Sequence, residues 1–147
     1  MQIDGQLRKS TDDGVYAAGD IVTLTNNAIL YLFSNIKYHL SGNEIESVNE
    51  PGQATTIMGL LKYQPTFPGL NQCWSLDSST EAAITNTGFA KRKDFILSSN
   101  PIGVFSFAID LKHILGFVDD YEKVVCDILS NLIVKLVTMM QYSRLLV

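Results

Sequence analysis

The chain has 147 residues, of which 46% are hydrophobic and 18% are charged, a composition typical of one folded globular domain and unlike that of a disordered chain or a fibre. Its formal net charge is −4, and its basic residues are scattered except for Lys91, Arg92 and Lys93, which argues against direct nucleic-acid binding. Cys73 and Cys126 are too few for a disulfide scaffold or a zinc knuckle, so we expect reduced, partly buried thiols. The N-terminus lacks a secretory pattern and no apolar run is long enough to span a membrane, which predicts a soluble intracellular protein.

The chain changes from polar to apolar near residue 20. Residues 1–20 are rich in Gly, Asp, Ser and Thr and lack periodicity, which predicts an arm or loop. Residues 21–25 and 29–33 are rich in β-branched and aromatic side chains and flank the turn-forming pair Asn26 and Asn27. We expect a strand on each side of that turn.

The clearest local signal is a hairpin. Ile36, Tyr38 and Leu40 alternate with polar residues, a period of two that buries one face of a strand and solvates the other. Residues 41–43 carry turn chemistry, so residues 44–48 can return as the antiparallel partner.

The middle of the chain predicts one helix and a long loop. Pro51 and Gly52 break the preceding strand, and apolar residues at helical spacing then predict a short helix around residues 53–62. Residues 64–86 contain prolines, a glycine and a Ser/Thr-rich stretch, which predict mostly loop with one short strand at residues 73–76.

The C-terminal third combines a clear strand with an ambiguous tail. A predicted turn at residues 100–103 leads into residues 104–110, which alternate as a half-buried strand does. Between residues 119 and 139 apolar side chains recur at helical spacing, so periodicity predicts a helical tail. Many short strands with little helix before the tail indicate an all-β fold, an antiparallel sandwich or barrel. No repeat or linker indicates a second domain.

Several segments also resemble, in order and spacing, the N-terminal jelly roll of the double jelly-roll major capsid proteins of Polinton/Maverick (adintovirus-like) elements. Each segment alone has an ordinary composition, and the specificity lies in their succession over about residues 21–126. The segments that carry the resemblance are residues 23–48, 51–55, 59–63, 71–74, 86–92, 103–107, 111–117 and 120–124.

The resemblance implies a fold and a function. It implies an antiparallel jelly-roll sandwich over residues 21–126, preceded by an arm or loop at 1–20 and followed by a divergent tail at 127–147. It implies a structural capsid protein and not an enzyme, with itself or related capsid subunits as partners, as in the homotrimers of intact relatives, and a place in the virion. Because the chain covers about one roll and family similarity is lost near Asp127, we expect a truncated or domesticated fragment with a change of reading frame there. A jelly-roll ligand- or carbohydrate-binding module is the alternative.

A flavin-dependent oxidoreductase fragment is a weaker alternative. Residues 14–22 resemble the segment of those enzymes in which an aspartate, here Asp20, meets the flavin side chain. That chemistry needs a glycine-rich phosphate turn between a strand and a helix, and no Gly-x-Gly-x-x-Gly occurs. We therefore expect a loop leading into the first strand.

The remaining polar candidates favour structural roles. His39 and His113 are the only histidines, too few for a three-histidine zinc site. We expect the side chain of His39 to face solvent and that of His113 to make a local hydrogen bond. Glu44 and Glu46 lie two apart on a strand and would share a solvated face. The acidic residues Asp119, Asp120 and Glu122 favour capping of the tail helix. We expect Cys73 beside Trp74, and the aromatic residues Phe105, Phe107 and Phe117, to form core. The sequence thus predicts no catalytic, cofactor-binding or metal-binding residue.

Overall fold

The computed structural model describes residues 1–64, 67, 69–77, 85–121 and 128–137, whose strands form two antiparallel sheets. These residues fall into two compact units. The first unit contains residues 1–28 and the described part of 65–109, and the second contains residues 29–64 and the described part of 110–141. Because the chain passes between the units near residues 28, 64 and 109, each unit is built from separated segments, which a search for a linker does not detect.

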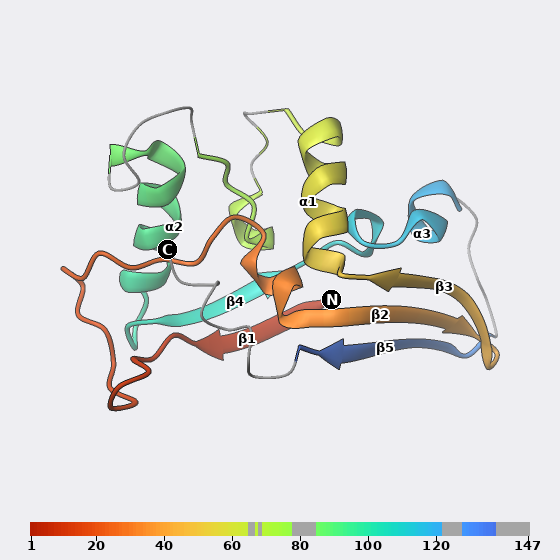
Figure 1. Ribbon diagram of the computed structural model, residues 1–147, viewed down its shortest axis with the longest axis horizontal. Coiled ribbons are helices and arrows are strands. Elements are labelled where there is room, and N and C mark those ends of the chain that lie inside the picture. Colours follow the sequence, from red (N-terminus) through yellow and green to blue (C-terminus); the bar gives the residue numbers. More distant parts are fainter. Residues whose placement is uncertain (65–66, 68, 78–84, 122–127, 138–147) are drawn as a thin grey trace. The chain divides into compact units, whose positions relative to one another are not determined.

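The sheet of the first unit has two strands. Strand β1 (Gln2–Gln6) pairs with β4 (Val104–Ala108) in an antiparallel register (Figure 1). The prediction of β4 is confirmed, with Phe107 2% exposed and Ser106 exposed. The prediction of an arm or loop is wrong for residues 2–6, because β1 is formed by pairing with a strand about a hundred residues away and local composition does not report that pairing.

A helix of the first unit was not predicted. Helix α2 (Thr87–Leu97) begins after Asn86, whose side chain accepts a hydrogen bond from the Gly88 N–H at 3.1 Å. Its buried face includes Phe89, Arg92 and Ile96, at positions i, i+3 and i+7. Because a charged residue occupies one inward position, the apolar periodicity of a helix is interrupted, and the expectation of little helix before the tail is wrong here.

Three predicted strands are absent from the positions given to them. Residues 21–25 belong to no named strand, and residues 29–33 lie mostly in the short 3-10 helix η1 (Ala28–Leu32). The segment predicted as a strand at residues 73–76 follows the 3-10 helix η2 (Leu70–Gln72) and is irregular. Several of their apolar side chains are nevertheless buried, Leu24, Leu30 and Trp74 among them. The apolar composition of these segments therefore indicated burial and did not indicate strand geometry.

The second unit confirms the predicted hairpin. Strands β2 (Phe33–Leu40) and β3 (Asn43–Asn49) pair in an antiparallel register, and β2 lies between β3 and β5 (Ser130–Leu136) (Figure 1). Ser41 and Gly42 join β2 to β3 with φ angles of 48° and 82°, the positive values that the favoured two-residue hairpin turn requires. Ile36 and Tyr38 are buried while Lys37 and His39 are only half-buried, as the alternation predicts.

The second unit confirms one predicted helix and contradicts part of another. Helix α1 (Pro51–Lys62) confirms the predicted short helix. The 3-10 helix η4 (Leu111–His113) and the one-turn helix α3 (Gly116–Asp120) follow in the second segment of the unit. The prediction of a helical tail is wrong at β5, because pairing with β2 overrides the local helical spacing. The parts of that prediction at residues 122–127 and 138–139, together with the predicted boundary at residue 126, lie outside the described residues.

Each unit has its own core. In the first unit the buried apolar side chains come from the segment before η1, the residues that follow η2, helix α2, and β4 with the residue after it: Leu24, Cys73, Trp74, Phe89, Ile96, Leu97, Phe107 and Ile109. In the second unit they come from η1, β2 and the segment before α3: Ile29, Leu30, Phe33, Ile36, Tyr38, Ile114 and Leu115.

Candidate interaction surface

Helix α1 buries its small residues and exposes its large ones. Pro51, Gly52, Thr55 and Gly59 face the interior of the second unit. A Cβ atom on Gly52 would lie 2.5 Å from the ring of Tyr31, so only glycine allows the helix to approach this closely. The contact surface of α1 is therefore formed by residues without large side chains.

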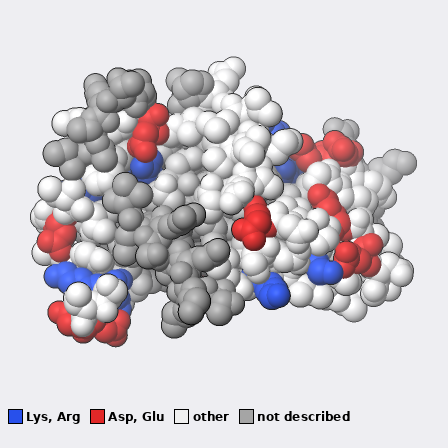
Figure 2. All heavy atoms as spheres, in the orientation of Figure 1, with Lys and Arg blue, Asp and Glu red and all other residues white. Residues whose placement is uncertain are grey.

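The opposite side of α1 is apolar. Ile57, Met58 and Leu61 are 61%, 57% and 80% exposed, and Leu60 is 54% exposed. Half-buried Ala54 with Ile57, Met58 and Leu61 repeats at i, i+3, i+4 and i+7, which is the pattern that normally faces a core, and Leu60 is next to Leu61 in the sequence. We call Ile57, Met58, Leu60 and Leu61 the α1 apolar surface. Over α1 the face of the molecule in Figure 2 is almost free of charged atoms.

Strand β5 is the second exposed apolar element. It lies at an edge of its sheet, and Ile133, Val134 and Leu136 are 51%, 42% and 60% exposed. Leu129, just before the strand, is 68% exposed. Exposed, apolar edge strands are templates for pairing with another chain, so β5 and the α1 apolar surface are both candidates for contact with a partner.

A β-bulge separates the two glutamates that the sequence placed on one face. The register of β2 with β3 shifts between Tyr38 and His39, so that Glu46 lies opposite Tyr38 while Glu44 lies opposite His39. Tyr38 and His39 are adjacent on β2 and point to opposite faces. The prediction of a shared face for Glu44 and Glu46 is therefore wrong, because one extra residue in β3 reverses the alternation.

The two carboxylates consequently have different partners. Glu44 accepts a hydrogen bond from Lys37 at 2.5 Å and lies 3.8 Å from the His39 Nε2; the hydrogen bond from Lys37 holds the pKa of Glu44 below its usual value. Glu46 accepts the N–H groups of Gly116 and Phe117, each at 2.9 Å. It thereby caps the first turn of α3 from a strand 70 residues away, a role that local sequence does not indicate.

The acidic residues Asp119 and Asp120 are the last two residues of α3. Glu122, and the residues in which the predicted tail helix would begin, lie outside the described residues. Asp119 accepts a hydrogen bond from Lys62 at 2.6 Å, which lowers the pKa of Asp119 and raises the pKa of Lys62. His113 is 7% exposed and its ring centroid lies 5.3 Å from that of Tyr63. Burial lowers the pKa of His113 and raises that of Tyr63. These contacts join α1 to the η4–α3 segment.

The basic residues Lys91, Arg92 and Lys93 lie on α2 and differ in exposure. Arg92 is 4% exposed, whereas Lys91 is exposed. The Arg92 guanidinium donates to the Leu24 carbonyl at 2.9 Å, to the Ser75 carbonyl, and to both carboxylate oxygens of Asp77 at 3.0 and 3.1 Å. Arg92 thus joins three segments of the first unit and does not contribute to a basic surface.

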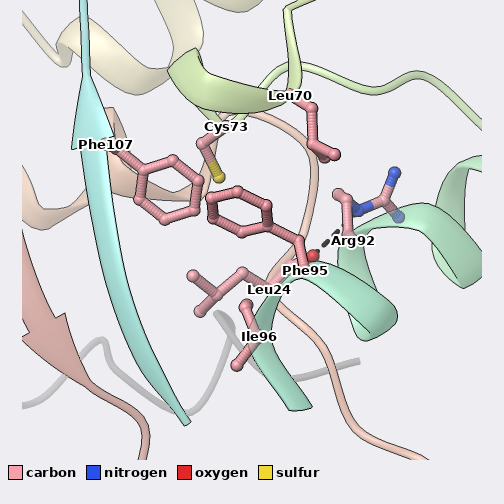
Figure 3. A pocket seen from close by; sticks show the side chains of 7 residues that line it. All are labelled: Leu24, Leu70, Cys73, Arg92, Phe95, Ile96 and Phe107. Atoms are coloured by element: carbon pink, nitrogen blue, oxygen red, sulfur yellow. Dashed lines mark hydrogen bonds between the residues drawn. The ribbon is translucent and has the colours of Figure 1, made fainter. Parts of the chain in front are cut away.

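The aromatic core beside Arg92 is closed to ligands. Phe95 and Phe107 stack with ring centroids 5.3 Å apart, and Cys73 points toward them (Figure 3). The cavity that these side chains line with Leu24 has a volume of about 10 Å³, the size of roughly one water molecule's probe sphere. Cys73 and Trp74 are 2% and 3% exposed, which confirms their prediction as core.

The remaining candidates do not come together as a site. Asp20 accepts the Ala17 N–H at 2.8 Å within a local turn. Every strand pairing among the described residues is antiparallel, so those residues hold no parallel sheet of the kind that a flavin phosphate site requires. No three His, Cys, Asp or Glu side chains in the described part of the chain are grouped as metal ligands. Likewise, within the described ranges no helix is long and apolar enough to cross a membrane.

Two antiparallel sheets and exposed apolar elements define a protein whose surfaces, and not a pocket, are its candidate functional features. Comparison with protein-family models matches residues 22–139 to the double jelly roll-like domain. The chain belongs to the double jelly roll-like domain family. The match includes residues 127–139, a segment predicted to diverge from the family, and β5 lies within it. No curated protein and no solved structure matches the chain.

Proposed function

We propose that this protein is a capsid-type structural subunit that acts by associating with copies of itself, and that it belongs to the Polinton/Maverick branch of the double jelly-roll family. The observation that carries the proposal is the α1 apolar surface, which presents four large side chains to solvent on a member of a family with a capsid-type fold. Shape and self-association then constitute the function, and no residue needs to perform chemistry.

The direction of the α1 side chains supports association. A helix that contributed only to the core of its own unit would bury its large residues and expose small or polar ones. Helix α1 has the reverse arrangement, with Gly59 buried and Leu61 80% exposed. Contiguous apolar surface of this kind is typical of protein–protein contact sites.

The expected strength of the contact follows from the exposed area. Complete burial of an isoleucine or leucine side chain contributes about 1.5–3 kcal/mol. Because Ile57 and Leu61 are 61% and 80% exposed, covering both contributes on the order of 2–4 kcal/mol. Replacing both with glutamine should therefore weaken association at least about tenfold.

Sedimentation equilibrium over a range of concentrations tests the proposal. We expect the wild-type chain to form oligomers and the double variant Ile57→Gln/Leu61→Gln to dissociate at concentrations at which the wild type remains associated. Glutamine retains helix propensity close to that of leucine, so circular dichroism should show α1 unchanged.

A matched control separates this contact from general hydrophobicity. Ile21 lies in the first unit and is 65% exposed, close to the 61% of Ile57. Ile21→Gln should leave the association constant unchanged. A wild-type chain that is monomeric at every concentration, or an equal loss of association in Ile21→Gln, would contradict the proposal.

A further inference from the structure

Strand β5 has a defined set of free backbone groups. The Ser41 N–H donates to the Leu129 carbonyl at 2.9 Å, and the Val137 N–H donates to the Leu32 carbonyl at 2.8 Å. Backbone groups alternate in direction along a strand, so the odd-numbered residues between 129 and 137 point to β2. The even-numbered residues Ser130, Leu132 and Val134 therefore present their N–H and C=O groups at the free edge. The Leu136 carbonyl accepts a hydrogen bond from the Ser34 hydroxyl of β2 at 3.5 Å.

The alternation is uninterrupted along β5. The irregularity in the pairing of β2 with β5 lies between Phe33 and Asn35, where β2 contains the extra residue. Strand β5 contains no proline or glycine, and Lys135 is its only charged residue. Bulges, prolines and repeated charges are the features that protect edge strands from pairing. Strand β5 has no bulge, no proline and a single charge.

The sequence of β5 is complementary to itself in one antiparallel register. When Ile133 is opposite Ile133 of a second copy, Leu132 lies opposite Val134 and Ser130 opposite Leu136. Leu132 and Val134 both have free-edge backbone groups, so this pair can be hydrogen-bonded in full. Lys135 is opposite Asn131 and not opposite the second lysine, so no like charges meet across the pair.

We infer that two copies of this chain associate through β5, in a two-fold antiparallel strand pair centred on Ile133. The pair would join two three-stranded sheets into one six-stranded sheet and would give the exposed Ile133, Val134 and Leu136 cross-strand neighbours on the second copy. An interface of this kind is isologous, because each copy contributes the same residues. The inference rests on the proposed self-association and specifies the surface, the symmetry and the register of one contact.

Disulfide cross-linking tests the register directly. Opposed residues of a non-hydrogen-bonded antiparallel pair have Cα atoms about 4.5 Å apart, which permits a disulfide. In the full chain carrying Cys126→Ser, with buried Cys73 retained, Ile133→Cys should form covalent dimers under mild oxidation. Asn131→Cys is the matched control: it lies on the same face of the same strand, but its copy would be four residues away, at about 13 Å. We expect dimers to form at least about tenfold faster in Ile133→Cys than in Asn131→Cys.

A second pair of variants tests the edge without a cysteine. The Val134 N–H points to the free edge and is not used by β2, so Val134→Pro removes a hydrogen bond only from the pair between copies. Val134→Thr, which keeps the β-branched shape and the N–H, is its control. We expect Val134→Pro to weaken dimerisation at least about tenfold and Val134→Thr to leave it unchanged, with both variants folded by circular dichroism.

The outcomes separate this inference from the proposed function. Equal cross-linking in Ile133→Cys and Asn131→Cys would overturn the β5 pair. Oligomers of unchanged size in Val134→Pro, together with dissociation to monomers in Ile57→Gln/Leu61→Gln, would also overturn it while supporting self-association. A chain that remains monomeric at every concentration would overturn both.

Discussion

Arg92 is the residue at which a single substitution should most damage the first unit. Methionine is a long apolar side chain that can line the same small cavity with Phe95 and Ile96, but it lacks the guanidinium. The carbonyls of buried Leu24 and half-buried Ser75 would then lose their donor. Arg92→Met therefore tests whether these hydrogen bonds hold the three segments of the first unit together.

The expected loss follows from those partners. An unsatisfied buried acceptor costs about 1–3 kcal/mol, and Arg92 donates to one buried carbonyl, that of Leu24, and to one half-buried carbonyl, that of Ser75. The ion pair adds less than about 1 kcal/mol, because the Asp77 side chain is 50% exposed and its charge is screened by solvent. We expect Arg92→Met to lower the free energy of unfolding by about 2–4 kcal/mol and Asp77→Asn to lower it by about 1 kcal/mol or less.

Urea unfolding followed by tryptophan fluorescence measures this loss. Trp74 is the only tryptophan in the chain, lies in the first unit and is 3% exposed, so its emission reports unfolding of that unit. Lys91→Met is the matched control, since Lys91 is exposed on the same helix and its replacement should change stability by less than about 0.5 kcal/mol. A loss below about 1 kcal/mol in Arg92→Met, or an equal loss in Lys91→Met, would refute the role of the buried guanidinium.

Three further predictions concern the second unit. Glu46→Ala should lower stability by about 1–2 kcal/mol and accelerate amide exchange at Gly116, with Glu46→Gln intermediate because it keeps one acceptor oxygen; unchanged exchange in hydrogen–deuterium experiments would contradict this. Gly52→Ala should destabilise by about 1–3 kcal/mol in thermal melts, despite the higher helix propensity of alanine, because its Cβ would meet Tyr31. Burial holds the folded-state pKa of His113 below its ordinary 6.5, so the unfolded chain binds the proton more readily and stability falls as the pH drops below about 6.5. His113→Gln should reduce this pH dependence in urea titrations at pH 7.5 and 5.0.

The elements that the sequence predicts correctly are those determined by neighbouring residues. The β2–β3 hairpin depends on alternation across Ile36 and Tyr38 and on a turn at Ser41 and Gly42, all within a short stretch. Helix α1 begins at Pro51, a residue favoured in the first turn of a helix. Each of these signals is local, so one sequence is sufficient to detect it.

The elements that the sequence does not predict depend on distant residues. Strand β1 exists because it pairs with β4, and β5 exists because it pairs with β2. Helix α2 was missed because Arg92 occupies an inward position, where its charge is satisfied by carbonyls and a carboxylate from two other segments. In each case the partner lies too far along the chain for periodicity to indicate it.

The candidate interaction surface also depends partly on local and partly on distant residues. The spacing of Ile57, Met58 and Leu61 is visible in the sequence, but whether such a stripe faces a core or solvent depends on where the rest of the unit lies. The small residues Gly52, Thr55 and Gly59 form the inward side of α1, because they allow the helix to pack more closely than large residues would. The large apolar residues are then left on the side that faces solvent. The bulge that separates Glu44 from Glu46 has no comparable local signal.

Two separate surfaces are what a shell subunit needs and what a simple dimer does not. A two-fold β5 pair is closed once two copies have joined, because each strand edge is used once. Growth beyond a dimer therefore requires a second contact, and the α1 apolar surface, which does not include β5, can supply it. If both contacts operate, Val134→Pro should leave oligomers joined through α1, Ile57→Gln/Leu61→Gln should leave dimers joined through β5, and only the combined variant should be monomeric. The size of the species that remain in each variant thus identifies which contact closes and which one extends the assembly.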